Sequence, residues 1–339
     1  MERGFLRLFL STSDPFILAQ AAVSREAVPT AWCESCLRRE QRREQTYGTF
    51  MPIMPILAIF LLLTGAILHT AWNLILKQSK DKYIATWWML VTGGVVALVA
   101  LVFTGLPPRE MWKFAIFSVI TEAAYFITLT YAYHDSEFSL VYPVARGTAP
   151  AFLALWSFVF LDERLATGGM IGLGLIIGGL FIMGLSTLLQ SHVSHLHFKG
   201  IAMALLIALL ISIYTTIDGA AVRHSAAYAL PYVMTMFALV PLPVTPFIVR
   251  EYGWQRLKEE WTKLGARLSI MGLIGVLAYL TAVLAFAIAP LSYSGAVREV
   301  SVVFGAIAGW WLLKERMGGL RVLGAIVIFL GILVIAMFG

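Results

Sequence analysis

The chain has 339 residues, of which 60% are hydrophobic and 13% are charged; a soluble domain has about 45–50% apolar and about 25% charged residues. Apolar runs of about 20 residues, long enough to cross a bilayer, recur along it. The formal net charge of +6 comes from dispersed lysines and arginines, which argues against a nucleic-acid partner. We therefore predict a polytopic helical membrane protein.

Residues 1–50 differ from the rest of the chain. They carry seven arginines, and their apolar stretch Phe5–Leu10 is too short to span a bilayer. We expect a poorly ordered tail; the alternative is that translation starts at Met51 or Met54. The tail also holds a C-x-x-C pair that begins at Cys33, and without a second pair of ligands this is weak evidence for zinc.

From residue 53 onward the sequence predicts ten membrane-spanning helices joined by short polar loops. The predicted spans are Ile53–Leu76, Tyr83–Thr104, Trp112–Tyr133, Ser139–Leu161, Gly168–Leu188, Gly200–Ala221, Ala227–Val249, Leu268–Ile288, Ser292–Leu313 and Leu320–Phe338. The longest loop, Arg250–Arg267, is rich in Trp, Lys and Glu and is typical of a helix lying at the membrane surface.

The two halves of the chain are related by a repeat. A constant shift of 152 residues superimposes Arg146 on Arg298, Glu163 on Glu315, Arg164 on Arg316, Gly172 on Gly324 and Gly179 on Gly331. The repeats cover residues 53–188 and 199–338. Since each holds five spans, an odd number, the second repeat must be inverted relative to the first, with a binding site near the bilayer midplane where they meet. The predicted fold is all-α, with ten transmembrane helices in two inverted five-helix repeats.

Loop charges leave the sidedness open. After residue 51, alternate loops carry twelve lysines and arginines on one side and four on the other, which would place both termini outside the cell. Counting the seven arginines of the tail removes this bias.

Ionisable and polar groups at membrane depth are costly, so they mark candidate functional sites. The candidates for substrate binding are His69, Trp72, Asn73, Tyr125, Tyr142, Arg146, Tyr214, Tyr279 and Arg298. The first three share one helical face of the first span. Asp218 and Lys77 lie close to span ends, where we expect them to be solvated.

Two interpretations of the arginines remain open. Arg146 and Arg298 could form structural ion pairs with Glu122 or Glu299, or they could clamp an anion, since a guanidinium is a rigid bidentate donor for carboxylate or phosphate. Burial and a nearby arginine act in opposite directions on a carboxyl group. Glu122, with Glu299 as the competing candidate, could therefore take up and release a coupling proton.

Glycine spacing indicates how two of the spans pack. Gly172 and Gly179 lie seven residues apart on one face, and Gly324 and Gly331 repeat this pattern, so the fifth and tenth spans can approach closely. We expect these spans to be scaffold, outside a cavity lined by spans 1, 3, 4, 6, 8 and 9.

Neither an enzyme nor a metal or cofactor protein is indicated. The sequence has no evident nucleophile–base pair and no nucleotide-binding loop. Three histidines at positions 192, 195 and 197 lack acidic or cysteine ligands nearby, so we expect no metal there.

The chain resembles the EamA domain of the drug/metabolite transporter superfamily. The likeness is carried by the segment Leu161–Leu165 with Gly172 and Gly179, repeated by Leu313–Arg316 with Gly324 and Gly331. The stretch around His69 is similar to a subgroup of bacterial members. The resemblance implies a multi-pass carrier of the bacterial inner membrane that moves metabolites by alternating access, with both termini cytoplasmic, a sidedness that the loop charges do not support.

These observations lead us to expect a secondary transporter of a small metabolite, anionic or carboxylate-bearing and coupled to protons. The expected partners are the substrate and the lipid bilayer, with a homodimer left open and no nucleic acid. One alternative is an exporter of cationic or aromatic compounds that binds them through Glu122 and Glu299. Another is a protein that moves lipids.

Overall fold

The computed structural model describes residues 54–135, 138–190, 198–313 and 318–339, and in these ranges the chain is helical with no β-strand. The predicted tail with its C-x-x-C pair and the three loop histidines lie outside the described residues. So do Glu315 and Arg316 of the second repeat.

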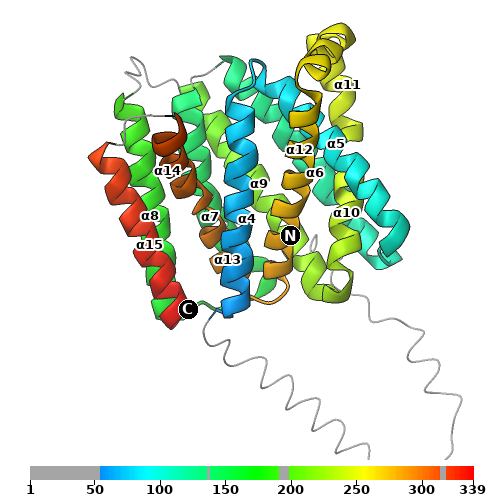
Figure 1. Cartoon of the computed structure of the whole chain (residues 1–339). Coiled ribbons are helices and arrows are strands. Elements are labelled where there is room, and N and C mark those ends of the chain that lie inside the picture. Colours follow the sequence, from blue (N-terminus) through cyan, green and yellow to red (C-terminus); the bar gives the residue numbers. More distant parts are fainter. Residues whose placement is uncertain (1–53, 136–137, 191–197, 314–317) are drawn as a thin grey trace, which may run out of the picture. The chain divides into compact units, whose positions relative to one another are not determined.

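The helices of the first half are α4 (Ile56–Lys77), α5 (Lys82–Thr104), α6 (Arg109–Asp135), α7 (Phe138–Leu161) and α8 (Thr167–Gln190). Those of the second half are α9 (Phe198–His224), the short 3₁₀ turn η1 (Ala226–Tyr228), α10 (Ala229–Leu239), α11 (Pro241–Tyr252), α12 (Trp254–Phe286), α13 (Leu291–Arg298), α14 (Ser301–Leu313) and α15 (Gly319–Phe338) (Figure 1). Within the described ranges nine segments are long and apolar enough to cross a membrane, with residues 226–252 forming one of them.

Two predicted elements differ from the structure. The ninth span is not one helix, because α13 ends at Arg298 and α14 begins at Ser301. The loop Arg250–Arg267 is not a separate surface helix: α11 ends at Tyr252, Gly253 supplies a positive φ of 76°, and α12 then runs unbroken from Trp254. Residues 254–267 contain no proline, so nothing in them interrupts the helix.

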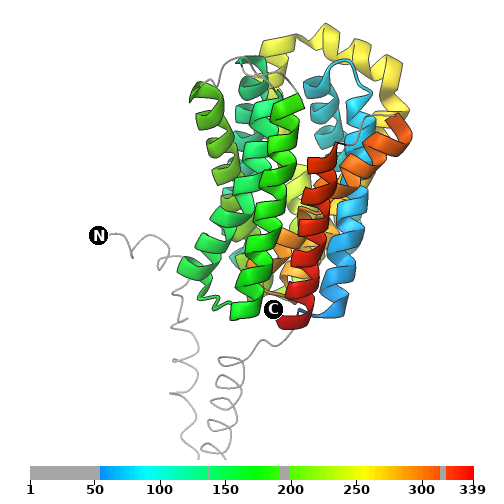
Figure 2. The same cartoon turned by 90° about the vertical axis from the view of Figure 1, so that its left-hand side faces the viewer.

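The central helices pack across the two halves of the chain. The first helix of the first half, α4, packs against α12 of the second half, and α9, the first long helix of the second half, packs against α6 and α7 of the first half. The broken pair α13 and α14 also contacts α4. Seen from the side in Figure 2, the long helices run roughly parallel to one another.

Close backbone contact joins α8 and α15 at one edge of the bundle (Figure 1). A Cβ placed on Gly172 would lie 2.7 Å from the carbonyl oxygen of Gly331, and one placed on Gly324 would lie 2.8 Å from that of Gly179. These distances are too short for any side chain, so the predicted approach through paired glycines is confirmed.

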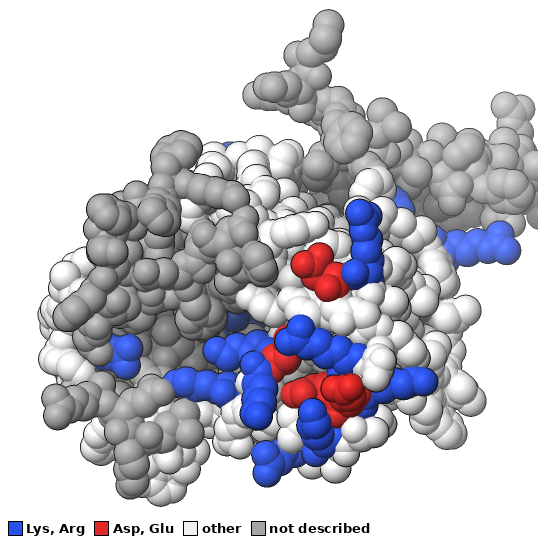
Figure 3. Space-filling view, turned by 90° about the horizontal axis from the view of Figure 1, so that it is seen from above, with Lys and Arg blue, Asp and Glu red and all other residues white. Residues whose placement is uncertain are grey.

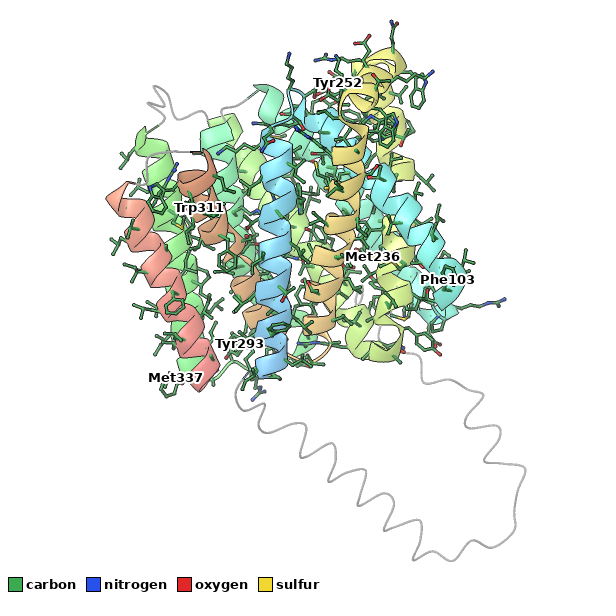
Figure 4. The ribbon with its side chains drawn as sticks, viewed as in Figure 1. Phe103, Met236, Tyr252, Tyr293, Trp311 and Met337 are labelled. Carbon is green, nitrogen blue, oxygen red and sulfur yellow. The ribbon has the colours of Figure 1, made fainter. Side chains whose placement is uncertain are left out.

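The outer surface suits a lipid environment. Large apolar side chains such as Phe103, Trp311 and Met337 are exposed on the outside of the helices, whereas Met236 and Tyr293 are buried (Figure 4). Figure 3 looks onto the end of the bundle that is uppermost in Figure 1, and there lysines and arginines gather together with carboxylates. Apolar sides with charge concentrated at an end are the distribution that a bilayer imposes.

The glycine contact generates a stability prediction. We expect Gly172→Ala to lower the thermal unfolding temperature of the purified protein by a few degrees, because the added methyl group forces α8 away from α15. Gly174→Ala is the matched control, since a Cβ there meets nothing within 4 Å and alanine is the better helix former. Equal unfolding temperatures for the two variants would contradict the packing argument.

Candidate functional site

A cavity of about 340 Å³ lies toward the end of the bundle where α4 ends and α15 begins. Its lining includes four cationic side chains and a histidine, namely Lys77, Lys82, Arg146, Arg321 and His69. Aromatic rings from α4, α5 and α6 complete much of the wall: Trp72, Tyr83, Tyr125 and Phe126. Over the described part of the chain no carboxylate lines this cavity.

The cavity brings together five of the predicted substrate-binding residues: His69, Trp72, Asn73, Tyr125 and Arg146. Asn73 donates a hydrogen bond of 2.7 Å to the backbone oxygen of His69, and the rings of His69 and Trp72 meet edge to face with centroids 4.9 Å apart. The side chain of Tyr142 lies outside the described residues. Tyr214, Tyr279 and Arg298 do not line the cavity among the residues described.

The walls of the cavity differ from those predicted. Leu180, Met183 and Gly184 of α8 and Arg321 of α15 belong to its lining, whereas no described residue of α12 does. The expectation that the fifth and tenth spans stay outside is therefore wrong, as is the expected contribution of the eighth. The reason is the position of the cavity near the end of α4, which α8 and α15 flank.

Arg146 connects this cavity to the buried Glu299. Its Nη1 donates to both carboxylate oxygens of Glu299, at 3.1 and 3.0 Å, and its Nη2 lies 2.8 Å from Nε2 of His69. A guanidinium can only donate, so Nε2 of His69 accepts and this imidazole is neutral, with its proton on Nδ1. Only 2% of the Glu299 side chain is exposed, against 14% of the Arg146 side chain.

The helix break lies at this ion pair. The N–H groups of Glu299 and Val300 bond three residues back, to Ala296 and Val297, both at 3.1 Å, as in a 3₁₀ turn. The Thr70 hydroxyl of α4 donates at 3.1 Å to the backbone oxygen of Ser301. Discontinuous helices with charged groups at the break are a common way to build a transporter binding site.

A second polar cluster lies around Asp218 on α9. This residue is fully buried, and its carboxylate accepts hydrogen bonds from the hydroxyl of Tyr232, at 2.7 Å, and from that of Tyr279. The expectation that Asp218 is solvated at a helix end is therefore wrong. It fails because α9 continues to His224 and because Tyr232 of α10 and Tyr279 of α12 bond to the carboxylate.

Arg298 links the second cluster to the first. Its Nη2 lies 3.8 Å from Oε1 of Glu299, and it interacts electrostatically with Asp218 and with the partly buried Glu122. Tyrosine rings connect the cavity to the same cluster. The centroid of Tyr214 is 6.0 Å from that of Tyr125 and 6.4 Å from that of Tyr279.

Glu163 carries a role that sequence reasoning missed. It accepts hydrogen bonds from the backbone N–H of Leu291, at 2.6 Å, and from that of Ser292, at 3.1 Å, and so caps the N-terminus of α13. It also pairs with Arg223, which donates at 3.0 Å to the backbone oxygen of Ala289. We call these contacts the Glu163 clasp. The signal was present in the repeated Glu-Arg pair, but its partner helix is 128 residues away in sequence.

Comparison with known proteins identifies the family. The model of the EamA-like transporter family matches residues 56–185 and 198–337. The chain belongs to the EamA-like transporter family. It is thus a multi-pass membrane transporter, and the predicted resemblance is confirmed.

The fold of this EamA transporter has a solved counterpart. A crystal structure described only as that of a protein is similar with a TM-score of 0.65 and 16% sequence identity, over 82% of this chain and 95% of that one. At this identity the likeness supports the arrangement of the helices and carries nothing about a substrate. No curated protein matches the chain.

The Glu163 clasp predicts a loss of stability on removing one charge. We expect Glu163→Gln to lower the thermal unfolding temperature by several degrees, because breaking a buried ion pair costs about 3–5 kcal/mol. The 25% exposure of the Arg223 side chain places the effect toward the lower end. Glu259→Gln, at an exposed carboxylate of α12, is the control. A Glu163→Gln protein as stable as this control would show that the clasp contributes little.

Proposed function

We propose that this EamA transporter is a secondary carrier that moves a small anionic metabolite, with a carboxylate or similar group, across the bacterial inner membrane by alternating access. The observation that carries the proposal is the charge of the cavity. Among the described lining residues it has four cations and no carboxylate, which favours a negatively charged ligand over a cation.

The size and the lining of the cavity support a small organic anion. A volume of about 340 Å³ lies at the lower end of the range of about 300–1,000 Å³ that is usual for small-molecule sites. The aromatic rings of Trp72, Tyr125 and Phe126 offer apolar contact to the body of the ligand. Arg146 would then hold its charged group at the deep end.

Arg146 is suited to exchange its partner carboxylate, that of Glu299, for an anionic substrate. In the structure its charge is balanced by Glu299, and its side chain also lines the cavity. An anionic substrate would compete with Glu299 for the guanidinium, and a proton on a carboxyl of the cluster would offset the added negative charge. Glu122 and Glu299 are the carboxyls proposed to carry this proton.

The packing of the helices supports alternating access. The pairing of α4 with α12 and of α9 with α6 is what a pseudo-twofold relation between the halves would produce. The cavity lies toward the end of α4, whereas the Glu163 clasp holds the N-terminus of α13 near the end of α7. A carrier that is accessible at one end of the bundle and held shut at the other has the arrangement that alternating access requires.

The transport prediction is a loss of anion uptake on removing the charge of Arg146. Purified protein in liposomes that enclose a pH-sensitive dye is exposed in turn to anionic, zwitterionic and cationic metabolites. We expect proton movement with an anion, abolished in Arg146→Gln because the neutral amide no longer balances the substrate charge. Arg109→Gln, an exposed arginine at the start of α6, is the matched control and keeps uptake.

The same assay separates the rival functions. Proton movement driven by a cation and unaffected by Arg146→Gln would overturn the anion proposal in favour of a cation exporter that uses Glu122 and Glu299. Movement of a fluorescent lipid between the bilayer leaflets, with no solute uptake in the same liposomes, would instead indicate a lipid-moving protein.

A further inference from the structure

We propose that the substrate of this carrier is an elongated dianion, a molecule with one anionic group at each end of an apolar body. Arg146 holds one end deep in the cavity, and a second group of cations holds the other end at the cavity mouth. We call this second group the outer subsite; its members are Lys77, Lys82 and Arg321. The inference rests on the proposed anion transport and adds to it the class of anion.

The four cations that line the cavity lie at two separate levels. Arg146 is at the deep level, where its Nη2 lies 2.8 Å from Nε2 of His69 on α4. Lys77 is the last residue of the same helix, eight residues after His69, which is about 12 Å along an α-helix. Lys82 begins α5 and Arg321 lies in the first turn of α15, so both belong to the level of Lys77, at the end of the bundle that is uppermost in Figure 1.

Between the two levels the described wall of the cavity is mainly apolar. It is formed by side chains from α4, α6 and α8, namely Trp72, Leu76, Phe126, Leu129 and Met183. The amide of Asn73 also lies there, but it donates to the backbone oxygen of His69 at 2.7 Å within its own helix. A ligand that fills the cavity therefore meets cations at both ends and apolar surface in between, which is the pattern of a dianion with an apolar body.

The cations of the outer subsite are not explained by the stability of their own helices. Lys82 is the first residue of α5 and Arg321 the third of α15, and a cation in the first turn is unfavourable because a helix N-terminus carries partial positive charge. The N-cap carboxylate of α5, Asp81, accepts from the backbone N–H of Ile84 at 3.3 Å and pairs with Arg256 at 2.9 Å. No carboxylate is among the described residues that line the mouth, so the potential there favours an anionic group.

The preference of lysine and arginine for one side of a membrane is a separate reason to find them at helix ends. Lys80 and Lys263 fit that reason, because they are exposed at the same end and are not among the described residues that line the cavity. The three cations of the outer subsite differ from them, since they converge on one cavity from three helices. This difference provides the control for the test.

The position of the outer subsite also limits the cost of a second negative charge. Two charges at membrane depth would be strongly unfavourable. Lys77 and Lys82 are exposed and Arg321 is half-buried, so an anionic group beside them stays in contact with water. Only the inner anionic group is then removed from water, where Arg146 and the proposed proton compensate its charge.

The test compares a dicarboxylate with its half-amide, which has the same length and a single charge. Binding to the purified wild-type protein is measured by titration calorimetry for the linear dicarboxylates from succinate to suberate and for the half-amide of each. We expect the best dicarboxylate to bind about tenfold more tightly than its half-amide, which is the effect of one additional charge-assisted contact. The preference should depend on length and be greatest where the ligand reaches both groups of cations at once.

A double variant tests the outer subsite itself. Lys82→Gln combined with Arg321→Gln should reduce the preference for the dicarboxylate to about twofold or less, because one cation of the three remains. A merely structural effect would weaken both ligands alike and leave the preference unchanged. Lys80→Gln combined with Lys263→Gln is the matched control, since it removes two positive charges from the same end, and it should keep the wild-type preference. Should the first double variant not fold, Lys82→Gln alone, at an exposed residue, should lower the preference about threefold.

The outcomes separate this inference from the proposed function. If the wild type neither binds nor transports any anion, the proposed function fails and the inference fails with it. If the liposome assay identifies a transported anion but the wild type shows no preference for a second charge, only the dianion is overturned. A preference of equal size at every ligand length, or one that the Lys82→Gln, Arg321→Gln protein retains in full, would indicate attraction by net charge alone and would also overturn the outer subsite.

Discussion

The structure depends on one ion pair that joins the two halves of the chain at the centre of the bundle. Arg146 of α7 and Glu299, at the junction of α13 and α14, are both largely removed from water. Either charge alone at this depth would be strongly unfavourable, so each requires the other. His69 of α4 joins this ion pair by accepting a hydrogen bond from the same guanidinium. Three separate segments are thereby held in register, and two of the groups involved, Arg146 and His69, also line the cavity.

The two ends of the bundle are built differently, although the chain is an internal repeat. At one end lies the cavity, with cationic and aromatic walls. At the other end Glu163 satisfies two backbone donors at the start of α13 and pairs with Arg223. These bonds join elements from both halves, so they must be released if that end is ever to open. The difference between the ends is a property of one conformation, and the proposed alternating access needs a second conformation in which the roles of the ends are exchanged.

Features that depend only on composition and local spacing were predictable from the sequence. Apolar runs identified the membrane helices, paired glycines identified the contact between α8 and α15, and membrane depth singled out Arg146 and Glu299. Three features depend on tertiary structure and were missed. No glycine or proline marks the helix break at Glu299 and Val300. The buried ion pair and the hydrogen bond from Thr70 are found at this break. Burial of Asp218 depends on tyrosines from α10 and α12. The partners of Glu163 lie far away along the chain.

Neutrality gives a physical reason for the proposed coupling of an anion to a proton. Closing the cavity removes its contents from water, and the energy of any uncompensated charge then rises as the surrounding dielectric falls. Closing the cavity of a carrier loaded with an anion alone would cost this electrostatic energy, and so would closing one loaded with a proton alone. In the proposed cycle the empty and the fully loaded carriers avoid it, because a bound proton offsets the charge of the bound anion. The electrostatic energy of closure alone can thus favour coupled transport over uncoupled transport, and no additional structural element that senses the bound substrate is required.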